Sequence, residues 1–265
     1  MGFSRSKRFQ QILFAIPLLI FPILYLAAGL PSANSQEAPP SHEMPMAHDH
    51  SHMSMPMDEP MDPAARAKHL ADKKESEFNH HLAGFFVVLA GIFILFEPAL
   101  KNRQPAVRYA WPLCFLISGI FLLVFSDTEL WPFGPKNWWI GVTGNLEVLQ
   151  HKTFAAILLG LGVIEIRRAR GTLRAAWSAW VFPVLAGAGS FLLLFHVHGG
   201  AMNGPDGMTA MERIQMQHFS YAATGAGIAL FNGLSNTPTR AQRVFRILWP
   251  LCMIALGVLL MFYVE

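Results

Sequence analysis

Apolar and polar residues follow one another along the chain in long blocks. Six apolar stretches cover residues 80–97, 108–126, 148–166, 177–196, 218–235 and 247–263. Each is close to the length of a helix that crosses a hydrocarbon layer of about 30 Å. Charged residues make up only 14% of the chain and hydrophobic residues 53%, whereas soluble domains are about 25% charged. We therefore expect an all-α integral membrane protein whose residues 79–265 form a bundle of six transmembrane helices.

The segment before the first of these stretches divides into two parts. In residues 1–35, basic residues precede a long apolar run, and Ala33 and Ser35 place small residues at the −3 and −1 positions of a cleavage site. This part is either a cleaved signal peptide or a retained anchor helix. Residues 36–78 are rich in Met, His and Pro and almost free of Leu, Ile, Val and aromatic residues. Such a segment buries too little apolar surface to offset its ordering entropy, so we expect it to be disordered.

The distribution of Lys and Arg predicts the orientation in the membrane. If residues 36–78 lie outside the cytoplasm, the opposite side of the membrane holds 13 of the 20 basic residues and only 2 of the 17 acidic residues. An excess of Lys and Arg marks the cytoplasmic side of short loops. We therefore expect a bacterial inner-membrane protein whose Met/His-rich segment is periplasmic, and whose loops at 98–107, 167–176 and 236–246 are cytoplasmic.

The helical part contains an internal repeat. The motif Trp-Pro-Leu-Cys at 111–114 recurs at 249–252, and Trp180 lies midway, 69 residues from each of the two tryptophans. The first helices match through Asn79-His80, Gln150-His151 and Gln217-His218. Self-similarity at a fixed period indicates repeated supersecondary units. We expect three tandem helical hairpins of about 69 residues, spanning about 79–127, 148–198 and 216–265, with pseudo-threefold symmetry.

Histidine and methionine are the candidate chemistry of this chain. All 11 histidines fall on the side of the membrane assigned to the periplasm, and many of the 13 methionines lie there too. Thioether sulfur is a soft ligand that selects Cu(I), while imidazole binds copper in both oxidation states. The segment before the first helix therefore predicts a copper-collecting tail, with candidate ligands His42, Met44, Met46, His48, His50, His52, Met53, Met55 and Met57.

Further histidines lie at the periplasmic ends of the expected helices. His80 and His81 open the first helix, and His196 and His198 close the fourth. We expect a shared metal site formed by His151, His218 and at least one of these four, because polar side chains at membrane depth are costly and usually functional. Haem ligation and ordinary interfacial histidines are the alternatives.

The Met/His-rich exported segment and the histidines clustered on one side of a polytopic membrane protein resemble bacterial copper-resistance membrane proteins of the CopD/PcoD type. The resemblance covers the tail and the placement of the histidines. It implies copper movement or handling at the periplasmic face of the inner membrane.

Several classes of function are excluded by what the sequence lacks. It has no Gly-x-x-x-x-Gly-Lys-Ser/Thr nucleotide loop and no Asp-Lys-Thr-Gly phosphorylation motif. Its basic residues fall between apolar runs and form no patch for nucleic acid, and two cysteines cannot form a Cys₄ zinc site. We expect a protein that collects copper for transport, resistance or delivery to a periplasmic copper carrier or copper enzyme, and a binding role rather than catalysis. The alternatives are a b-type cytochrome with one haem in the outer leaflet and, less favoured, an assembly or scaffold subunit.

Overall fold

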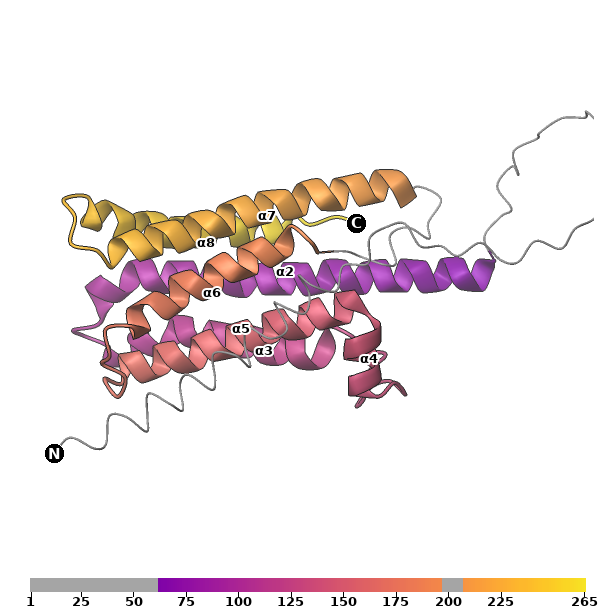
Figure 1. Ribbon diagram of the computed structural model, residues 1–265, viewed down its shortest axis with the longest axis horizontal. Coiled ribbons are helices and arrows are strands. Elements are labelled where there is room, and N and C mark those ends of the chain that lie inside the picture. Colours follow the sequence, from indigo (N-terminus) through magenta and orange to yellow (C-terminus); the bar gives the residue numbers. More distant parts are fainter. Residues whose placement is uncertain (1–61, 197–206) are drawn as a thin grey trace, which may run out of the picture.

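The computed structural model describes residues 62–196 and 207–265, and these residues are helical throughout, apart from turns and loops. No strand is present in either described range; the nearest feature is an isolated bridge between Leu130 and Lys136. The helices, labelled as in Figure 1, are α2 (Pro63–Leu100), η1 (Pro105–Tyr109), α3 (Ala110–Phe125), α4 (Trp138–Gly144), α5 (Leu146–Ala169), α6 (Ser178–Leu193), α7 (Gly207–Ser235) and α8 (Gln242–Met261).

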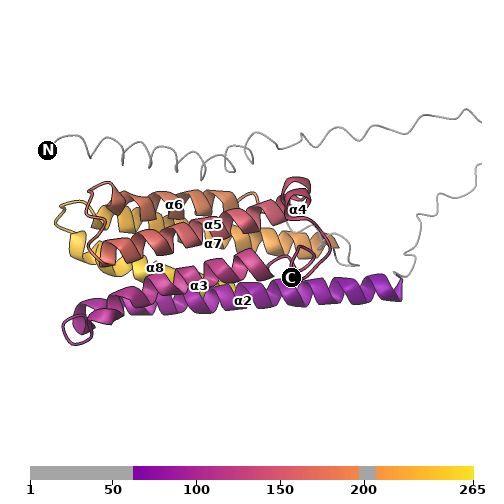
Figure 2. The same cartoon turned by 90° about the horizontal axis from the view of Figure 1, so that it is seen from below.

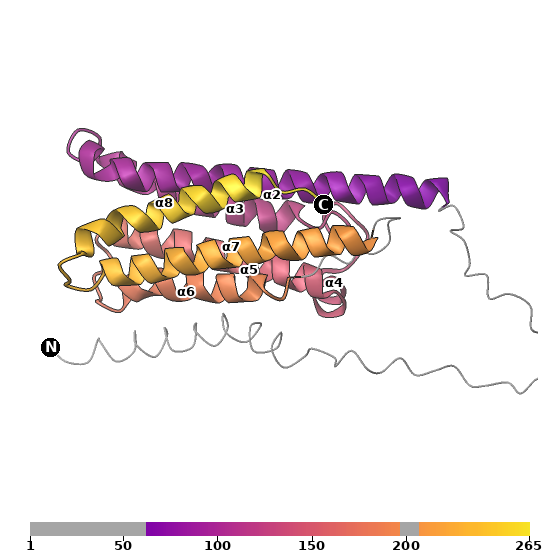
Figure 3. The same ribbon diagram turned by 90° about the horizontal axis from the view of Figure 1, so that it is seen from above.

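The long helices form one elongated bundle, seen from two further sides in Figures 2 and 3. Going along the chain, α2 packs against α3, α3 against α5, α5 against α6, α6 against α7, and α7 against α8. The last helix then packs against the first, because α8 also contacts α2. The helices therefore form a closed ring around a central space.

Helix α2 begins much earlier than the apolar pattern predicts. Residues 63–78 were expected to be disordered, and they are instead the first turns of this helix. Asp62 caps the helix through its side chain, and Pro63 occupies the first turn, where its missing N–H costs nothing. The alanine-rich sequence that follows has high helix propensity. The prediction of disorder was wrong because it rested only on the small apolar surface that these residues can bury. They extend a helix that is already nucleated by its apolar part, which costs little. Residues 36–61 lie outside the described residues.

Four of the described helical segments are long and apolar enough to cross a membrane. They are Pro63–Leu100, Pro105–Phe125, Leu146–Ala169 and Gln242–Met261. Helix α6 is apolar but has only 16 residues. Helix α7 has 29 residues but does not belong to this group. Its first half carries Glu212, Arg213 and two glutamines, Gln215 and Gln217, which lower its mean hydropathy.

An aromatic layer lies in the half of the bundle where α3, α6 and α8 begin. Trp111 of α3, Phe182 of α6 and Trp249 of α8 lie with their ring centres 5.3–6.3 Å apart. Each of these residues directly precedes a buried proline. Trp180, expected to match the two tryptophans, is 46% exposed instead. Two residues correspond to about 200° around a helix, so Phe182 faces the core and Trp180 faces away.

The buried prolines give the register of the repeat. Pro112, Pro183 and Pro250 are 71 and 67 residues apart, and so are His80, His151 and His218. The expected even spacing of about 69 residues was the mean of two unequal intervals. Matching positions also make matching contacts: Gly162 of α5 packs against the carbonyl of Pro112, as Gly91 of α2 packs against that of Pro250.

Candidate functional site

Four histidines from different helices lie next to one another at one end of the bundle, which we call the histidine end. His80 is on α2, His151 on α5 and His218 on α7, while His196 follows α6. The ring centre of His196 lies 4.8 Å from that of His218 and 5.4 Å from that of His151. The ring centre of His80 lies 6.1 Å from that of His218. The order of contact is therefore His151, His196, His218 and His80, and we call these four residues the histidine cluster.

The backbone after α6 places His196 in the cluster. Helix α6 ends at Leu193, and the next residues continue with tighter hydrogen bonds, from the N–H of Leu194 to the carbonyl of Phe191 and from that of His196 to Leu193. Such three-residue steps are usual where a helix unwinds. The sequence predicted unwinding at this point from Gly199 and Gly200, which lie outside the described residues together with His198.

Gln150, on α5, fixes the ring of His196. Nδ1 of His196 donates a 2.7 Å hydrogen bond to Oε1 of Gln150, and Nε2 of Gln150 donates a 2.8 Å bond to the carbonyl of Phe195. The Gln150 side chain is fully buried. The second bond decides which end of the amide faces the imidazole, so Nδ1 of His196 must carry the proton.

A buried carboxylate holds His151 in the same way. Oδ1 of Asp127 lies 3.1 Å from Nδ1 of His151, and Oδ2 lies 2.7 Å from Nζ of Lys152. Nζ of Lys152 also donates to the carbonyl of Leu123 and to the hydroxyl of Ser126. Burial on its own would raise the pKa of Asp127, but the hydrogen bonds and the charge of these partners lower it to about 2. Asp127 is therefore ionised at any physiological pH.

His80 is oriented by its own helix and by the chain after α8. Nδ1 of His80 donates a 2.8 Å hydrogen bond to the carbonyl of Ser76. The phenol ring of Tyr263 stacks on the imidazole, with ring centres 3.9 Å apart. Burial raises the pKa of Tyr263, so the phenol stays neutral. His81 points elsewhere, and its Nε2 lies 3.0 Å from the carbonyl of Tyr263.

These contacts determine which ring nitrogen carries the proton in three of the four histidines. In His80, His151 and His196, the proton on Nδ1 is held by a carbonyl, a carboxylate and an amide oxygen. In the neutral ring, Nε2 is then the nitrogen with a lone pair. Histidines that bind metals almost always donate their other N–H to a carboxylate, a backbone carbonyl or a water. The outer hydrogen bonds of the histidine cluster are of the kind found around metal sites.

The rings are not arranged around a common point. Within residues 62–196 and 207–265, no group of three or more His, Cys, Asp or Glu side chains could hold a metal ion as placed. Two imidazoles that bind one ion at about 2.0–2.1 Å have ring centres roughly 5–6 Å apart, close to the distances found here. The spacing of the rings is therefore close to that of a metal site, whereas their orientation is not.

A cavity of about 690 Å³ extends from the histidine cluster into the centre of the ring. All four histidines line it, and its deeper wall includes Leu161, Phe182 and Met253. From His151 to Leu161 the helix rises about 15 Å, so the cavity reaches toward the aromatic layer. Most of its deep lining is apolar, and its opening carries one lysine, Lys68, and six carboxylates, Asp72, Glu75, Asp127, Glu129, Glu147 and Glu265. Two of these carboxylates, Asp127 and Glu129, form ion pairs with Lys152 and Lys136.

The structure thus brings together four of the residues that the sequence proposed as ligands, and separates His81 from them. His42, Met44, Met46, His48, His50, His52, Met53, Met55 and Met57 lie outside the described residues. Sequence reasoning missed Asp127 and the role of Gln150. The signal for Gln150 was present, since the Gln-His pair marks the repeat. Asp127 could have been suspected as an acid directly after an apolar run, but its partners on α5 could not.

Comparison of the chain with protein-family models, with curated proteins and with solved structures finds no match.

Proposed function

We propose that this chain is a copper-binding, multi-pass inner-membrane protein that collects copper at the periplasmic face. The observation that carries the proposal is the gathering of four histidines from different helices into the histidine cluster. Three of its rings have Nδ1 fixed by an acceptor, and neighbouring ring centres lie 4.8–6.1 Å apart. Side-chain rotation toward a shared ion would complete such a site.

The choice of copper rests on the neighbouring ligands in the sequence. A run of methionines and histidines lies between residues 42 and 57. Thioethers favour Cu(I), and zinc or hard cations rarely use them. Carboxylates outnumber lysines at the opening of the cavity even when Lys136 and Lys152 are counted with Lys68, and this excess of negative charge attracts cations. The tail would raise the local supply of copper, and the histidine cluster would hold the ion for transport, resistance or delivery to a periplasmic carrier or copper enzyme.

The proposal includes six membrane spans arranged as three hairpins, α2 with α3, α5 with α6 and α7 with α8. Support comes from the closed ring of helices and from the equal separation of 32 residues between histidine and proline in each hairpin, as in His80 and Pro112. In this arrangement α6 and α7 cross the membrane within the ring although they are shorter or more polar than the other four. The excess of Arg in the loops opposite the histidine end supports a cytoplasmic location for those loops.

Copper titration of the purified full-length protein against a chromophoric Cu(I) ligand tests the proposal. His196→Ala and His218→Ala should each remove one tight site, whereas the matched control His81→Ala should not, because His81 lies on the same end outside the cluster. Deletion of residues 36–60 should leave that site intact and impair copper uptake mainly when copper is scarce. Unchanged copper binding in both cluster variants would contradict the proposal.

One observation favours a second candidate, a b-type cytochrome. A metal ion alone needs no cavity of about 690 Å³, whereas this volume and its apolar lining suit an organic ligand of drug size. Histidines at its opening could ligate a haem in the outer leaflet. Visible absorption of the purified protein distinguishes the copper protein from the cytochrome. A Soret band without bound copper would favour the cytochrome, and bound copper without a Soret band would exclude it.

A further inference from the structure

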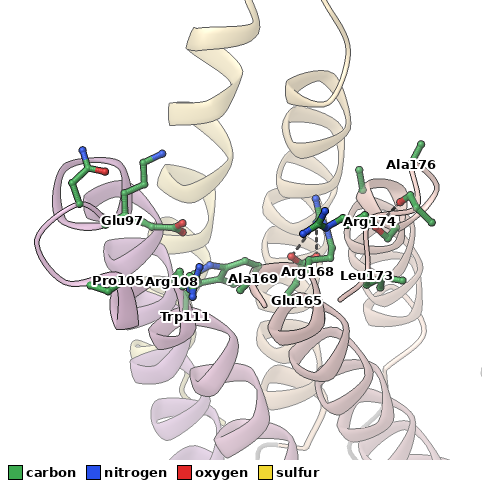
Figure 4. A pocket seen from close by; sticks show the side chains of 15 residues that line it. Glu97, Pro105, Arg108, Trp111, Glu165, Arg168, Ala169, Leu173, Arg174 and Ala176 are labelled. Atoms are coloured by element: carbon green, nitrogen blue, oxygen red, sulfur yellow. Dashed lines mark hydrogen bonds and ion pairs between the residues drawn. The ribbon is translucent and has the colours of Figure 1, made fainter. Parts of the chain in front are cut away.

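A second cavity of about 690 Å³ lies at the opposite end of the bundle, which we call the arginine end (Figure 4). It is bounded by α2, the chain around η1, α5 and the turn that leads into α6. The charged side chains that line it are Lys101, Arg108, Arg168 and Arg174, together with Glu97 and Glu165. None of these residues belongs to the histidine cluster, and the proposed copper function assigns them no role.

The local structure explains how the arginines reach one cavity. Helix α5 ends where Gly171 adopts a positive φ of 70°, and the N–H of Gly171 bonds the carbonyl of Arg168. This turn reverses the chain, and Nε of Arg174 then donates a 2.8 Å hydrogen bond to the carbonyl of Gly171. Figure 4 shows Arg108 on one side of the space, and Arg168 with Arg174 on the other.

The charges in the cavity are unequal. Glu165 is buried, and both of its oxygens bond Nη1 of Arg168, at 2.7 and 2.9 Å, so this pair is neutral. Glu97 interacts electrostatically with Lys101, one helical turn further on, and more weakly with Arg108, so it offsets one positive charge. Arg108 and Arg174 form no ion pair with a carboxylate in the part of the chain that the structure describes. With four positive groups and two carboxylates in its lining, the cavity therefore has an excess of two positive charges.

We propose that the cavity at the arginine end binds the phosphate group of an anionic ligand, held by Arg108 and Arg174. The planar guanidinium fork matches phosphate oxygens in pairs, and the bond is stronger than one between neutral groups. A phosphate presents enough oxygens for two forks from opposite sides, which a single carboxylate does not. Two kinds of ligand carry such a phosphate group: a phospholipid of the adjoining leaflet, through its headgroup, and a soluble phosphate compound.

The test uses the full-length protein in a phosphate-free maltoside detergent. One arm adds phosphatidylglycerol and counts retained lipids by native mass spectrometry, and the other adds inorganic pyrophosphate and measures equilibrium binding. Saturable binding only in the first arm identifies a lipid headgroup as the ligand, and saturable binding only in the second identifies a soluble phosphate compound. Saturable binding in both arms shows a site that accepts either. Absence of saturable binding in both arms overturns the proposal.

Matched variants separate a site from general surface charge. The pair Arg108→Gln and Arg174→Gln should weaken binding by about tenfold or more, the loss expected for charge-assisted forks. The control pair Arg103→Gln and Arg170→Gln removes the same charge from exposed residues of the same two turns outside the cavity, and should change binding less than about twofold. Equal losses in the two pairs overturn the proposal.

A third variant controls for the case in which the double glutamine variant loses binding because it misfolds. Arg108→Lys with Arg174→Lys keeps both charges and removes only the forks. We expect it to keep the thermal midpoint of the parent protein and to lose most of the tight binding. Parent-like affinity in this variant would show that charge alone attracts the anion, and would also overturn the assignment of a phosphate site to these two residues.

Discussion

Gln150 of α5 accepts a hydrogen bond from His196, which follows α6, although 46 residues separate them in the chain. The same glutamine is tied to the carbonyl of Phe195, so one buried amide fixes both the backbone after α6 and the tautomer of the imidazole. The matching glutamine of the third hairpin, Gln217, instead bonds the backbone of Val264 through both ends of its amide. The repeat therefore supplies the residue type, and the local packing decides its partner.

The first prediction concerns Gln150. Replacing it with Leu removes the acceptor that holds Nδ1 of His196, and should weaken copper binding by about 10–100-fold, as for other outer hydrogen bonds of metal ligands. Gln217→Leu is the matched control and should leave copper affinity unchanged. Cu(I) competition on both purified variants measures this. Equal affinities for the two variants would show that the amide does not orient the site.

The second prediction concerns Asp127. Asp127→Asn removes the carboxylate between His151 and the buried Lys152, and loss of one partner of a buried ion pair costs about 3–5 kcal/mol. Because the folded pKa of Asp127 is lowered to about 2 from an ordinary value of 3.8, its contribution is complete above about pH 4 and falls as the pH drops toward 2. Thermal midpoints of parent and variant should differ most near neutral pH and converge below pH 4. A constant difference down to pH 2 would contradict this.

The third prediction concerns the contact between α2 and α8. A Cβ added to Gly84 would lie 2.5 Å from the carbonyl oxygen of Gly257, which is backbone and cannot yield cheaply. Gly84→Ala should therefore destabilise the bundle by about 1–3 kcal/mol. Gly160→Ala, in the middle of α5, meets nothing within 4 Å and should be neutral or stabilising by up to about 1 kcal/mol. Thermal unfolding in detergent compares the two, and a tolerated Gly84→Ala would mean that these helices pack less closely.

The fourth prediction concerns the aromatic layer. Trp249 is 8% exposed and Trp180 46%, so Trp249→Ala should cost about 3–5 kcal/mol and Trp180→Ala much less. The comparison uses the same substitution at two residues that the sequence motif placed in equivalent positions. Similar thermal midpoints for the two variants would favour the alignment through Trp180 and contradict the alignment through Phe182.

The fifth prediction concerns orientation. Single cysteines at Asn102 and Gly204, in a chain whose native Cys114 and Cys252 are replaced by Ser, should be labelled from opposite sides of the membrane. A membrane-impermeant maleimide applied to the periplasmic side should modify position 204 and leave position 102 unmodified. Labelling of position 102 from that side would reverse the proposed location of the histidine cluster and of the arginine end together.

The sequence alone determined that this chain is helical and largely apolar, and it placed the histidines together. Block-like hydropathy identifies long helices because the length of an apolar run is a local property. Self-similarity identified His80, His151 and His218 as equivalent for the same reason. The alignment of the repeats was wrong where two nearby residues both matched one position of the motif, as Trp180 and Phe182 do, since only packing decides which side chain faces the core.

Tertiary structure decided everything that depends on which helices meet. The closure of the ring by α2 and α8 joins residues far apart in the chain, and no local pattern encodes it. The order of the four rings, and the acceptors Asp127, Gln150 and Ser76 that fix three of them, follow from that closure and from the backbone after α6. Either ring nitrogen of a neutral histidine can carry the proton. The hydrogen-bond partner selects which one does, and that partner is known only when the helices are in place.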